Sequence, residues 1–206
     1  MQLYTHPQSR GQTLMPLLQE LQIQDQIEII QVSWEDLQQP EYRAMNPLGK
    51  VSLLVDGPVF ISETPAIFAY LADHFFEQGL APALDDPQRG AYFKWLFFCH
   101  GPLTEWIDLS NFQISQAQLE QHKRGLGMGL PEDLMAFLKQ GLQQQANPYL
   151  LGERMSAADL YLAYWLAYAI ALKAIPYLEE FRPYLQWMAQ RPSLSQVIWF
   201  QQLDQH

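Results

Sequence analysis

The stretch 46–71 reads NPLGKVSLLVDGPVFISETPAIFAYL, and it limits the possible folds more than any other part of the chain. Apolar residues alternate with other residues over 51–56, which is typical of a β-strand. Asp56-Gly57 favours a tight hairpin turn, and an apolar run suited to a return strand follows it. Thr64 then offers an N-cap side chain, and Pro65 fits the first helical position, where its missing N–H is not needed. The stretch therefore predicts a hairpin followed directly by a helix.

The residues before this stretch add a βαβ unit. We expect a strand at 3–5, a helix from about 9 to 22, a strand at 27–32 and a helical turn near 41–45. Pro16 leaves two alternatives for the first helix. If Ser9 caps the helix, Pro16 lies in its interior and should kink it; if the regular helix begins near Thr13, Pro16 lies in the first turn and costs little. The order of elements over 1–77 is then βαβ–ββα.

The rest of the chain has no strand pattern. Residues 78–86 form a linker rich in helix breakers, and all of 87–206 is predicted to be helical with short connections. The expected helices span 87–109, 116–145 with an interruption at 125–131, 160–172, 176–190 and 193–203. Ser156 and Asp159 form a variant of the capping box before the run 160–172, which is apolar on every side. The expected class is α+β, with an all-helical bundle after the first domain.

Composition excludes several kinds of protein. Twelve Lys and Arg against 22 Asp and Glu give a net charge of −10, which argues against nucleic acid or an anionic membrane as the main partner. Cys99 is the only cysteine, so an intramolecular disulfide, a CxxC pair and a thiolate-rich metal site are impossible. The five histidines show no ligand spacing, and we expect no metal. No apolar run approaches the ~20 residues that span a bilayer, and no signal-peptide pattern opens the chain. We expect a cytoplasmic protein.

Two motifs resemble the cytosolic glutathione transferases. The stretch 46–71 is similar to their pattern Asn-Pro-x-Gly-Lys-Val-Pro-x-Leu, a hairpin, and Glu-Ser before a helix reading Ala-Ile-x-x-Tyr-Leu. Tyr149-Leu-x-Gly with Ser156-x-Ala-Asp159 resembles the motif of their helical domain. The resemblance covers nearly the whole chain. It implies a thioredoxin-like domain and a helical domain, glutathione as co-substrate, a homodimer, and a detoxifying transfer of glutathione to a small hydrophobic electrophile.

The resemblance also implies a site for the thiol after the first strand. Ser9 occupies the place of the thiolate-stabilising serine in serine-type members, although an ordinary N-cap serine also explains the position. His6 stands where tyrosine-type members have tyrosine, so a tyrosine mechanism is unexpected; His6 is either a donor to sulfur or a loop histidine. Arg10 is a candidate to orient the peptide, with a solvent-exposed arginine as the alternative.

The rest of glutathione would bind along 50–64. The resemblance places the γ-glutamyl carboxylate at Thr64 and the α-amino group near Glu63. It pairs the cysteinyl unit with the Val51 backbone, and Lys50 could meet the glycyl carboxylate. The family has a cis-proline at the next position, whereas this chain has Ser52. The Val51-Ser52 bond is either held cis or is trans with a reshaped pocket.

The second substrate and the activity itself leave alternatives. Candidates to line an electrophile pocket are His6, Phe98, Cys99, His100 and Trp106. An aromatic helix face is more often core than pocket, and Cys99 lacks an evident cationic partner apart from the neighbouring histidine. Ser52 also favours a rival hypothesis, a non-catalytic binding or regulatory protein with this fold. A glutathione-dependent isomerase or reductase is less well supported, because the serine-cysteine motif and an active-site cysteine after the first strand are absent.

Overall fold

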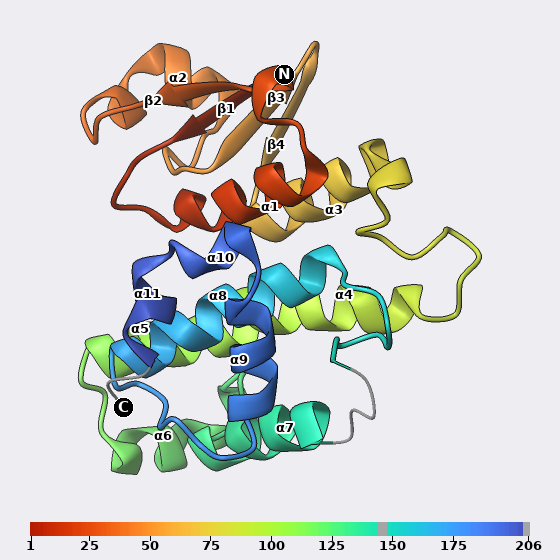
Figure 1. The fold of residues 1–206 in the computed structure, drawn as a ribbon. Helices are drawn as coiled ribbons and strands as arrows, with labels where there is room; N and C mark the ends of the chain where they lie inside the picture. The colour runs from red at the N-terminus through yellow and green to blue at the C-terminus, as the bar shows by residue number, and fades with distance from the viewer. Residues whose placement is uncertain (144–147, 204–206) are drawn as a thin grey trace. The chain divides into compact units, whose positions relative to one another are not determined.

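Two units form the chain, one built on a mixed sheet (1–80) and one that is helical in its described part (81–206). The computed structural model describes residues 1–143 and 148–203 (Figure 1). The first unit is a thioredoxin-like domain with helices on both faces of its sheet, and the second is a helical bundle. The expected α+β class is confirmed.

The sheet has the strand order β2-β1-β3-β4. Its strands are β1 (Gln2–Thr5), β2 (Glu28–Gln31), β3 (Leu53–Asp56) and β4 (Val59–Ser62). β1 pairs in parallel with β2 and antiparallel with β3, and β3 and β4 form the predicted hairpin. Asp56 pairs with Val59 across the turn, where Gly57 has a φ of +55° that a side chain would disfavour.

The first unit, all of whose residues are described, contains three α-helices, and proline and N-cap positions set where they begin. They are α1 (Leu14–Leu21), α2 (Pro40–Met45) and α3 (Thr64–His74). A 3₁₀ turn over 10–13 precedes α1, so Pro16 lies in the first α-helical turn and the second alternative for this proline is correct. The prediction for Thr64 was wrong by one position: Glu63 occupies the N-cap of α3 without a side-chain cap bond, and Thr64 is the first helical residue.

Both faces of the sheet are covered. Helices α1 and α3 lie on one face, and α2 with the 3₁₀ turn before it lies on the other (Figure 1). Leu53 and Leu54 of β3 are consequently both fully buried. The alternation seen in the sequence therefore does not separate a buried from an exposed face, because β3 is an inner strand of a sheet with helices on both sides.

The second unit contains eight α-helices in its described residues. They are α4 (Arg89–Phe98), α5 (Thr104–Asn111), α6 (Gln116–His122), α7 (Pro131–Gln143), α8 (Ala157–Ala171), α9 (Arg182–Ala189), α10 (Pro192–Ser195) and α11 (Ile198–Gln201). None of the helices in the described part of the chain has the length and apolarity needed to cross a membrane.

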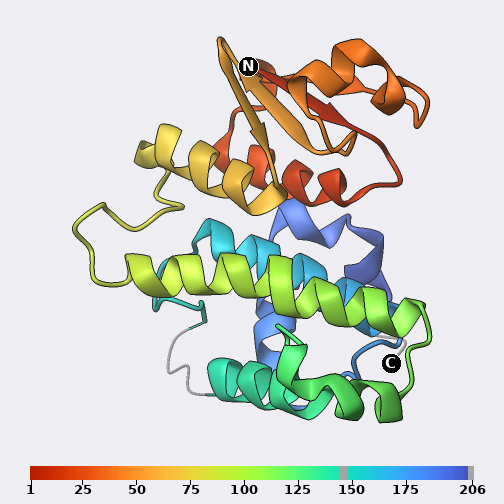
Figure 2. The same cartoon turned by 180° about the vertical axis from the view of Figure 1, so that it is seen from behind.

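Three predicted helices, those over 87–109, 176–190 and 193–203, differ from those observed. The helix expected over 87–109 is α4 and α5 joined by a π-helical turn (Cys99–Leu103), and Figure 2 shows them as one rod. Pro102 lies in that turn and cannot donate to the α-helical ladder, which explains the wider turn. The end of the helix expected over 116–145, Gln144 and Gln145, lies outside the described residues. Residues 176–181 are not helical, and 193–203 divides into parts of two short helices.

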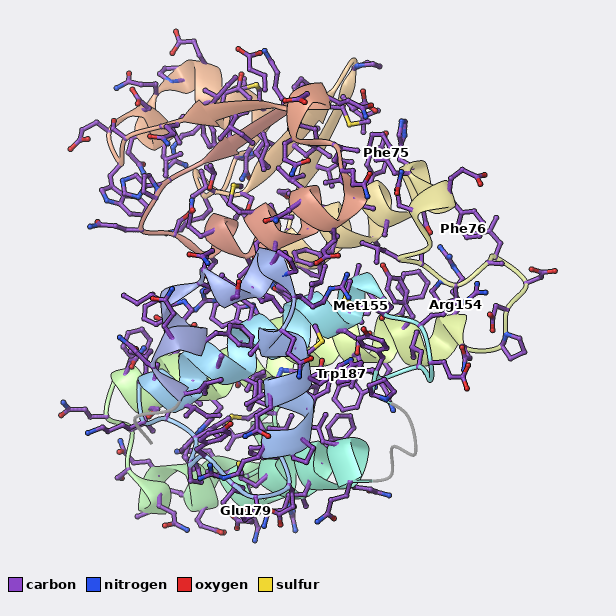
Figure 3. The ribbon with its side chains drawn as sticks, viewed as in Figure 1. Phe75, Phe76, Arg154, Met155, Glu179 and Trp187 are labelled. Atoms are coloured by element: carbon purple, nitrogen blue, oxygen red, sulfur yellow. The ribbon has the colours of Figure 1, made fainter. Side chains whose placement is uncertain are left out.

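The predicted capping box fixes the start of α8, the buried central helix. The backbone N–H and hydroxyl of Ser156 donate to Asp159 Oδ2 at 2.8 and 2.7 Å, and Leu150 N donates to Oδ1 at 2.7 Å. Tyr184 of α9 donates to the Asp159 carbonyl at 3.0 Å. Met155, labelled in Figure 3, directly precedes this box and is buried. The Asp159 carboxylate thus connects α8 to the preceding loop.

Stability should depend on the ionisation of Asp159. Burial raises the pKa of this carboxyl to about 6, against hydrogen bonds from Leu150 and Ser156 that lower it. The folded state therefore binds the proton more tightly than the unfolded state. This group's contribution to the free energy of unfolding is greatest below about pH 4 and decreases by about 2–3 kcal/mol as the pH rises to about 6.

Asp159→Asn removes that titration. We expect the difference in unfolding free energy between the wild type and Asp159→Asn to shrink between pH 4 and 6.5, as measured by urea denaturation at each pH. Subtracting the two proteins removes the titration of the other carboxylates. A difference that stays constant over this range would show that Asp159 does not titrate there.

Candidate functional site

The register of the sheet brings three distant segments together at one end of β3. Leu53, the first residue of β3, pairs with Tyr4 on one side and with Ser62 on the other. Both partner strands run antiparallel to β3, so the residues that follow them lie beside the residues that precede Leu53. The loop that begins after β1, the segment 50–52 and the start of α3 therefore meet at this end of the sheet.

Ser9 is the N-cap of the first helical turn, and its hydroxyl is fully engaged. Its Oγ accepts from Gly11 N at 3.1 Å and donates to the His6 carbonyl at 2.7 Å. The same carbonyl also accepts from Ser9 N at 3.0 Å and from the Gln12 side chain at 3.2 Å. The cap role foreseen as the alternative for Ser9 is therefore present. Arg10, the next residue, is exposed.

His6 is held as part of this loop. Its Nδ1 accepts a hydrogen bond from Gln8 N at 3.0 Å, which leaves the proton of the neutral ring on Nε2. The imidazole stacks on Trp34, with ring centroids 4.0 Å apart and an interplanar angle of 30°. These contacts hold the imidazole ring, and the backbone carbonyl of His6 holds Ser9 by accepting hydrogen bonds from its hydroxyl and N–H.

Gly11 allows the loop to approach β1 closely. A Cβ atom there would collide with Thr5 Oγ1, and would lie 3.1 Å from Ser52 Oγ and 3.2 Å from Ser9 Oγ. Thr5 is buried, and its Oγ1 has no hydrogen-bond partner within the described residues. Only glycine fits at this position without displacing one of these three hydroxyl groups.

Ser52 and Thr64 form the other part of the site. Their side chains are 4% and 6% exposed, and their hydroxyl oxygens lie 3.4 Å apart. The Val51-Ser52 peptide bond is cis, the first of the two alternatives for this bond. Thr64 opens α3, and Glu63 before it has a φ of +66° and a carbonyl that accepts from Ala66 N and Ile67 N. A helix N-terminus with a hydroxyl at its first residue suits a carboxylate.

Two side chains hold the segment before Ser52. The Tyr42 hydroxyl and the Asn46 amide both donate to the Lys50 carbonyl, at 2.6 and 2.8 Å. Burial raises the pKa of Tyr42 to about 12, so the hydroxyl remains a donor at neutral pH. No hydrogen bond from the Val51 N–H or C=O is present in the part of the chain that the structure describes. The Val51 backbone groups can therefore pair with an added peptide backbone.

Sequence reasoning missed Thr5, Gly11, Tyr42 and Asn46 as parts of this site. The Asn-Pro pair was visible as part of the motif over 46–71, but the carbonyl that Asn46 holds was not. Nothing in the local pattern around Tyr42 indicates its partner, because the Lys50 carbonyl lies eight residues further along, beyond the end of α2.

The candidates for a second-substrate pocket lie in different units. His6 is in the first unit, whereas the other four belong to α4, the π-helical turn and α5. Phe98 stacks on Phe137 with centroids 4.3 Å apart, and Trp106 Nε1 donates to the Ala174 carbonyl at 2.9 Å. His100 Nδ1 lies 3.4 Å from the Tyr161 hydroxyl.

Cys99 is unsuited to nucleophilic chemistry. The residue is completely buried, and burial raises the pKa of its thiol well above its usual range, with the nearby Asp159 carboxylate adding to the effect. The reactive thiolate is therefore suppressed at neutral pH. All four residues from the helical unit make packing or hydrogen-bond contacts within it.

Comparison with known proteins gives a consistent result. Residues 1–73 match the glutathione S-transferase N-terminal domain, and residues 119–198 match the glutathione S-transferase C-terminal domain. Glutathione S-transferase GstA of Escherichia coli O157:H7 is 28% identical over 160 residues, 77% of each chain. Glutathione S-transferase F10 of Arabidopsis thaliana is 31% identical over 135 residues, 59% of each chain. A sphingomonad glutathione S-transferase, solved in complex with glutathione, has a TM-score of 0.70 at 22% identity and covers 100% of both chains.

Gly11→Ala tests the close packing of the first turn. We expect a loss of about 1–3 kcal/mol in unfolding free energy, because the new methyl group must displace Thr5 or the turn. Thr5→Ala should restore part of the loss, so the two substitutions should be non-additive in a denaturation experiment. Gly90→Ala is the control, because a Cβ at this helical position meets nothing within 4 Å. Additive losses would disprove the contact.

Proposed function

The chain belongs to the glutathione S-transferase family, and from this membership we propose that it joins the thiolate of glutathione to a small hydrophobic electrophile. The proposal includes glutathione as co-substrate, a homodimeric state and a cytoplasmic location. The sphingomonad relative was solved with glutathione bound, which supports the first of these for a chain of the same fold.

The chemistry requires an ionised thiol at neutral pH. A free thiol has a pKa of roughly 8.5, and each unit by which a protein lowers it requires about 1.36 kcal/mol of preferential stabilisation of the thiolate. Hydrogen-bond donors and a helix N-terminus supply such stabilisation. The proposed site must therefore hold the peptide by its charged ends and aim donors at its sulfur.

The start of α3 is the proposed site for the γ-glutamyl group. The hydroxyl and N–H of Thr64 would bind the carboxylate, since the positive end of the helix favours an anion there. The Glu63 carboxylate, one residue earlier and exposed, would lie near the α-amino group. Both roles use groups at one helix end, which fixes the orientation of the peptide.

The segment 50–51 is the proposed site for the rest of the peptide. The N–H and C=O of Val51 would pair with the cysteinyl backbone as an added strand. Tyr42 and Asn46 hold the neighbouring carbonyl in place, so this strand is ordered before the ligand arrives. The exposed Lys50 side chain would meet the glycyl carboxylate.

The sulfur would then lie near the first helical turn, where Ser9 is the proposed catalytic residue. Its hydroxyl can donate to sulfur only by turning away from the His6 carbonyl. Arg10 would add positive potential beside the peptide. In the reaction with an aryl halide, the sulfur lone pair forms the C–S bond, the halide leaves with the electrons of the C–halogen bond, and the thiol proton passes to solvent.

The observation that carries the proposal is the meeting of the Ser9 turn, Ser52 and Thr64 at one end of β3. The Gly11 Cβ position lies within 3.2 Å of two of these hydroxyls, and the Thr64 hydroxyl is 3.4 Å from Ser52. The proposed sites for the thiol and for the carboxylate would therefore be neighbours, as one peptide with both groups requires.

A non-catalytic glutathione-binding protein is the second candidate. The observation in its favour is that Ser9 already donates its proton to His6, which leaves the serine of the serine-type mechanism engaged. Such a protein would bind immobilised glutathione without accelerating its reaction with an aryl halide. The two candidates thus differ in turnover, not in binding.

Thr64→Val and Ser9→Ala test the two proposed subsites. Thr64→Val should weaken glutathione binding about tenfold or more, because a hydrogen bond to a charged group is lost, as measured by calorimetry.

Ser9→Ala should lower kcat with aryl halide at pH 6.5 by about tenfold and raise the pKa of the bound thiol. Ser195→Ala, which removes a hydroxyl of α10 that donates only to the Pro192 carbonyl at 3.4 Å among the described contacts, should change neither. A wild type that binds no glutathione at millimolar concentration would refute the proposed function.

A further inference from the structure

The hydroxyl groups at the end of β3 differ in how they are engaged. Ser9 both donates and accepts at hydrogen-bond distance within its own turn. Within the described residues, the hydroxyls of Ser52 and Thr64 have a hydrogen-bond contact only with each other, and 3.4 Å between oxygens is a long contact for two hydroxyls. The proton of Ser52 is therefore much less firmly committed than that of Ser9.

Ser52 also lies beside the first helical turn, where the proposed function places the sulfur. Its Oγ lies 3.1 Å from the Gly11 Cβ position, about as near as Ser9 Oγ at 3.2 Å. The two oxygens thus flank the same point beside the first helical turn. Ser52 is 4% exposed, so a hydrogen bond from it is little weakened by competing water.

We propose that Ser52 donates a hydrogen bond to the glutathione sulfur and contributes more to thiolate stabilisation than Ser9 does. The inference rests on the proposed function, and it assigns the residue that departs from the family pattern to the reacting atom. Proline at this position has no hydroxyl, so the interaction is a property of this chain.

The number of protons supports the assignment. Without ligand, one of the two hydroxyls donates to the other across 3.4 Å, and the second proton has no acceptor among the contacts of this pair. Glutathione supplies two acceptors, a carboxylate at Thr64 and a thiolate near Ser52. Each hydroxyl then donates to its own anion, and no donor in the pair is left over. Ser9 would have to break its 2.7 Å bond to His6 to do the same.

Glutathione and S-methylglutathione separate contact with sulfur from contact with the rest of the peptide. S-methylglutathione keeps both carboxylates and the amino group but has no thiolate. The Kd of each compound is measured by calorimetry at pH 8 for the wild type, Ser52→Ala, Ser9→Ala and Thr64→Val. The pKa of the bound thiol is measured from thiolate absorbance against pH.

Ser52→Ala should weaken glutathione binding about tenfold, leave the Kd of S-methylglutathione unchanged, and raise the pKa of the bound thiol by about one. Ser9→Ala should raise this pKa by less. Thr64→Val should weaken both compounds alike, because both carry the γ-glutamyl carboxylate. Retained binding of S-methylglutathione also shows that Ser52→Ala keeps its folded site.

Two outcomes would overturn the inference. Equal weakening of both compounds by Ser52→Ala would assign Ser52 a structural role only, and an unchanged thiol pKa in that variant would remove it from the sulfur. Either result leaves wild-type glutathione binding intact, and with it the proposed function. A wild type that binds neither compound would instead refute the proposed function itself.

Discussion

The pairing of Leu53 with two strands at once is the constraint on which the site depends. Tyr4 lies on one side of this residue and Ser62 on the other, so the chain leaves the sheet twice, after β1 and β4, and enters it once, at β3, at the same end. A one-residue slip of either neighbour would turn its side chains to the opposite face. Segments as far apart in sequence as those of Ser9 and Thr64 therefore lie at the same end of β3.

Close packing does the rest. Gly11 lets the first helical turn approach Thr5, and Ser52 fills the space between that turn and α3. The result is a group of small polar side chains in a largely buried place, where larger residues would exclude a ligand. Cys99, the only cysteine of the chain, is buried inside the helical unit, and burial raises the pKa of its thiol. A reactive thiol at neutral pH would therefore have to come from a ligand.

The sequence predicted the elements of the fold well because their signals are local. The hairpin, the capping box before α8 and the N-cap role of Ser9 each follow from side chains within four residues of one another. The predictions for the helix over 87–109 and for the N-cap of α3 were wrong because backbone conformation, not the side-chain pattern, set the helix boundaries there. Pro102 converts a helix into two with a π turn between them, and Glu63 takes the cap position ahead of Thr64.

The candidate site was less predictable than the fold. Its residues could be named by resemblance, but their engagement could not, because it depends on contacts between segments. That Ser9 donates to His6, or that Thr5 lies against Gly11, is visible only in three dimensions. The sequence left open whether Ser52 reshapes the pocket, whereas the structure places its hydroxyl oxygen 3.4 Å from that of Thr64.

The way the Lys50 carbonyl is held has a consequence for how such a site can diverge. Its two donors are the side chains of Tyr42 and Asn46, not neighbouring strands. Substitutions at these two positions can shift the proposed peptide-binding edge while the ladder of β1, β3 and β4 stays as it is. Ligand preference and sheet architecture are thus under separate control in this unit, and selection can act on one without changing the other.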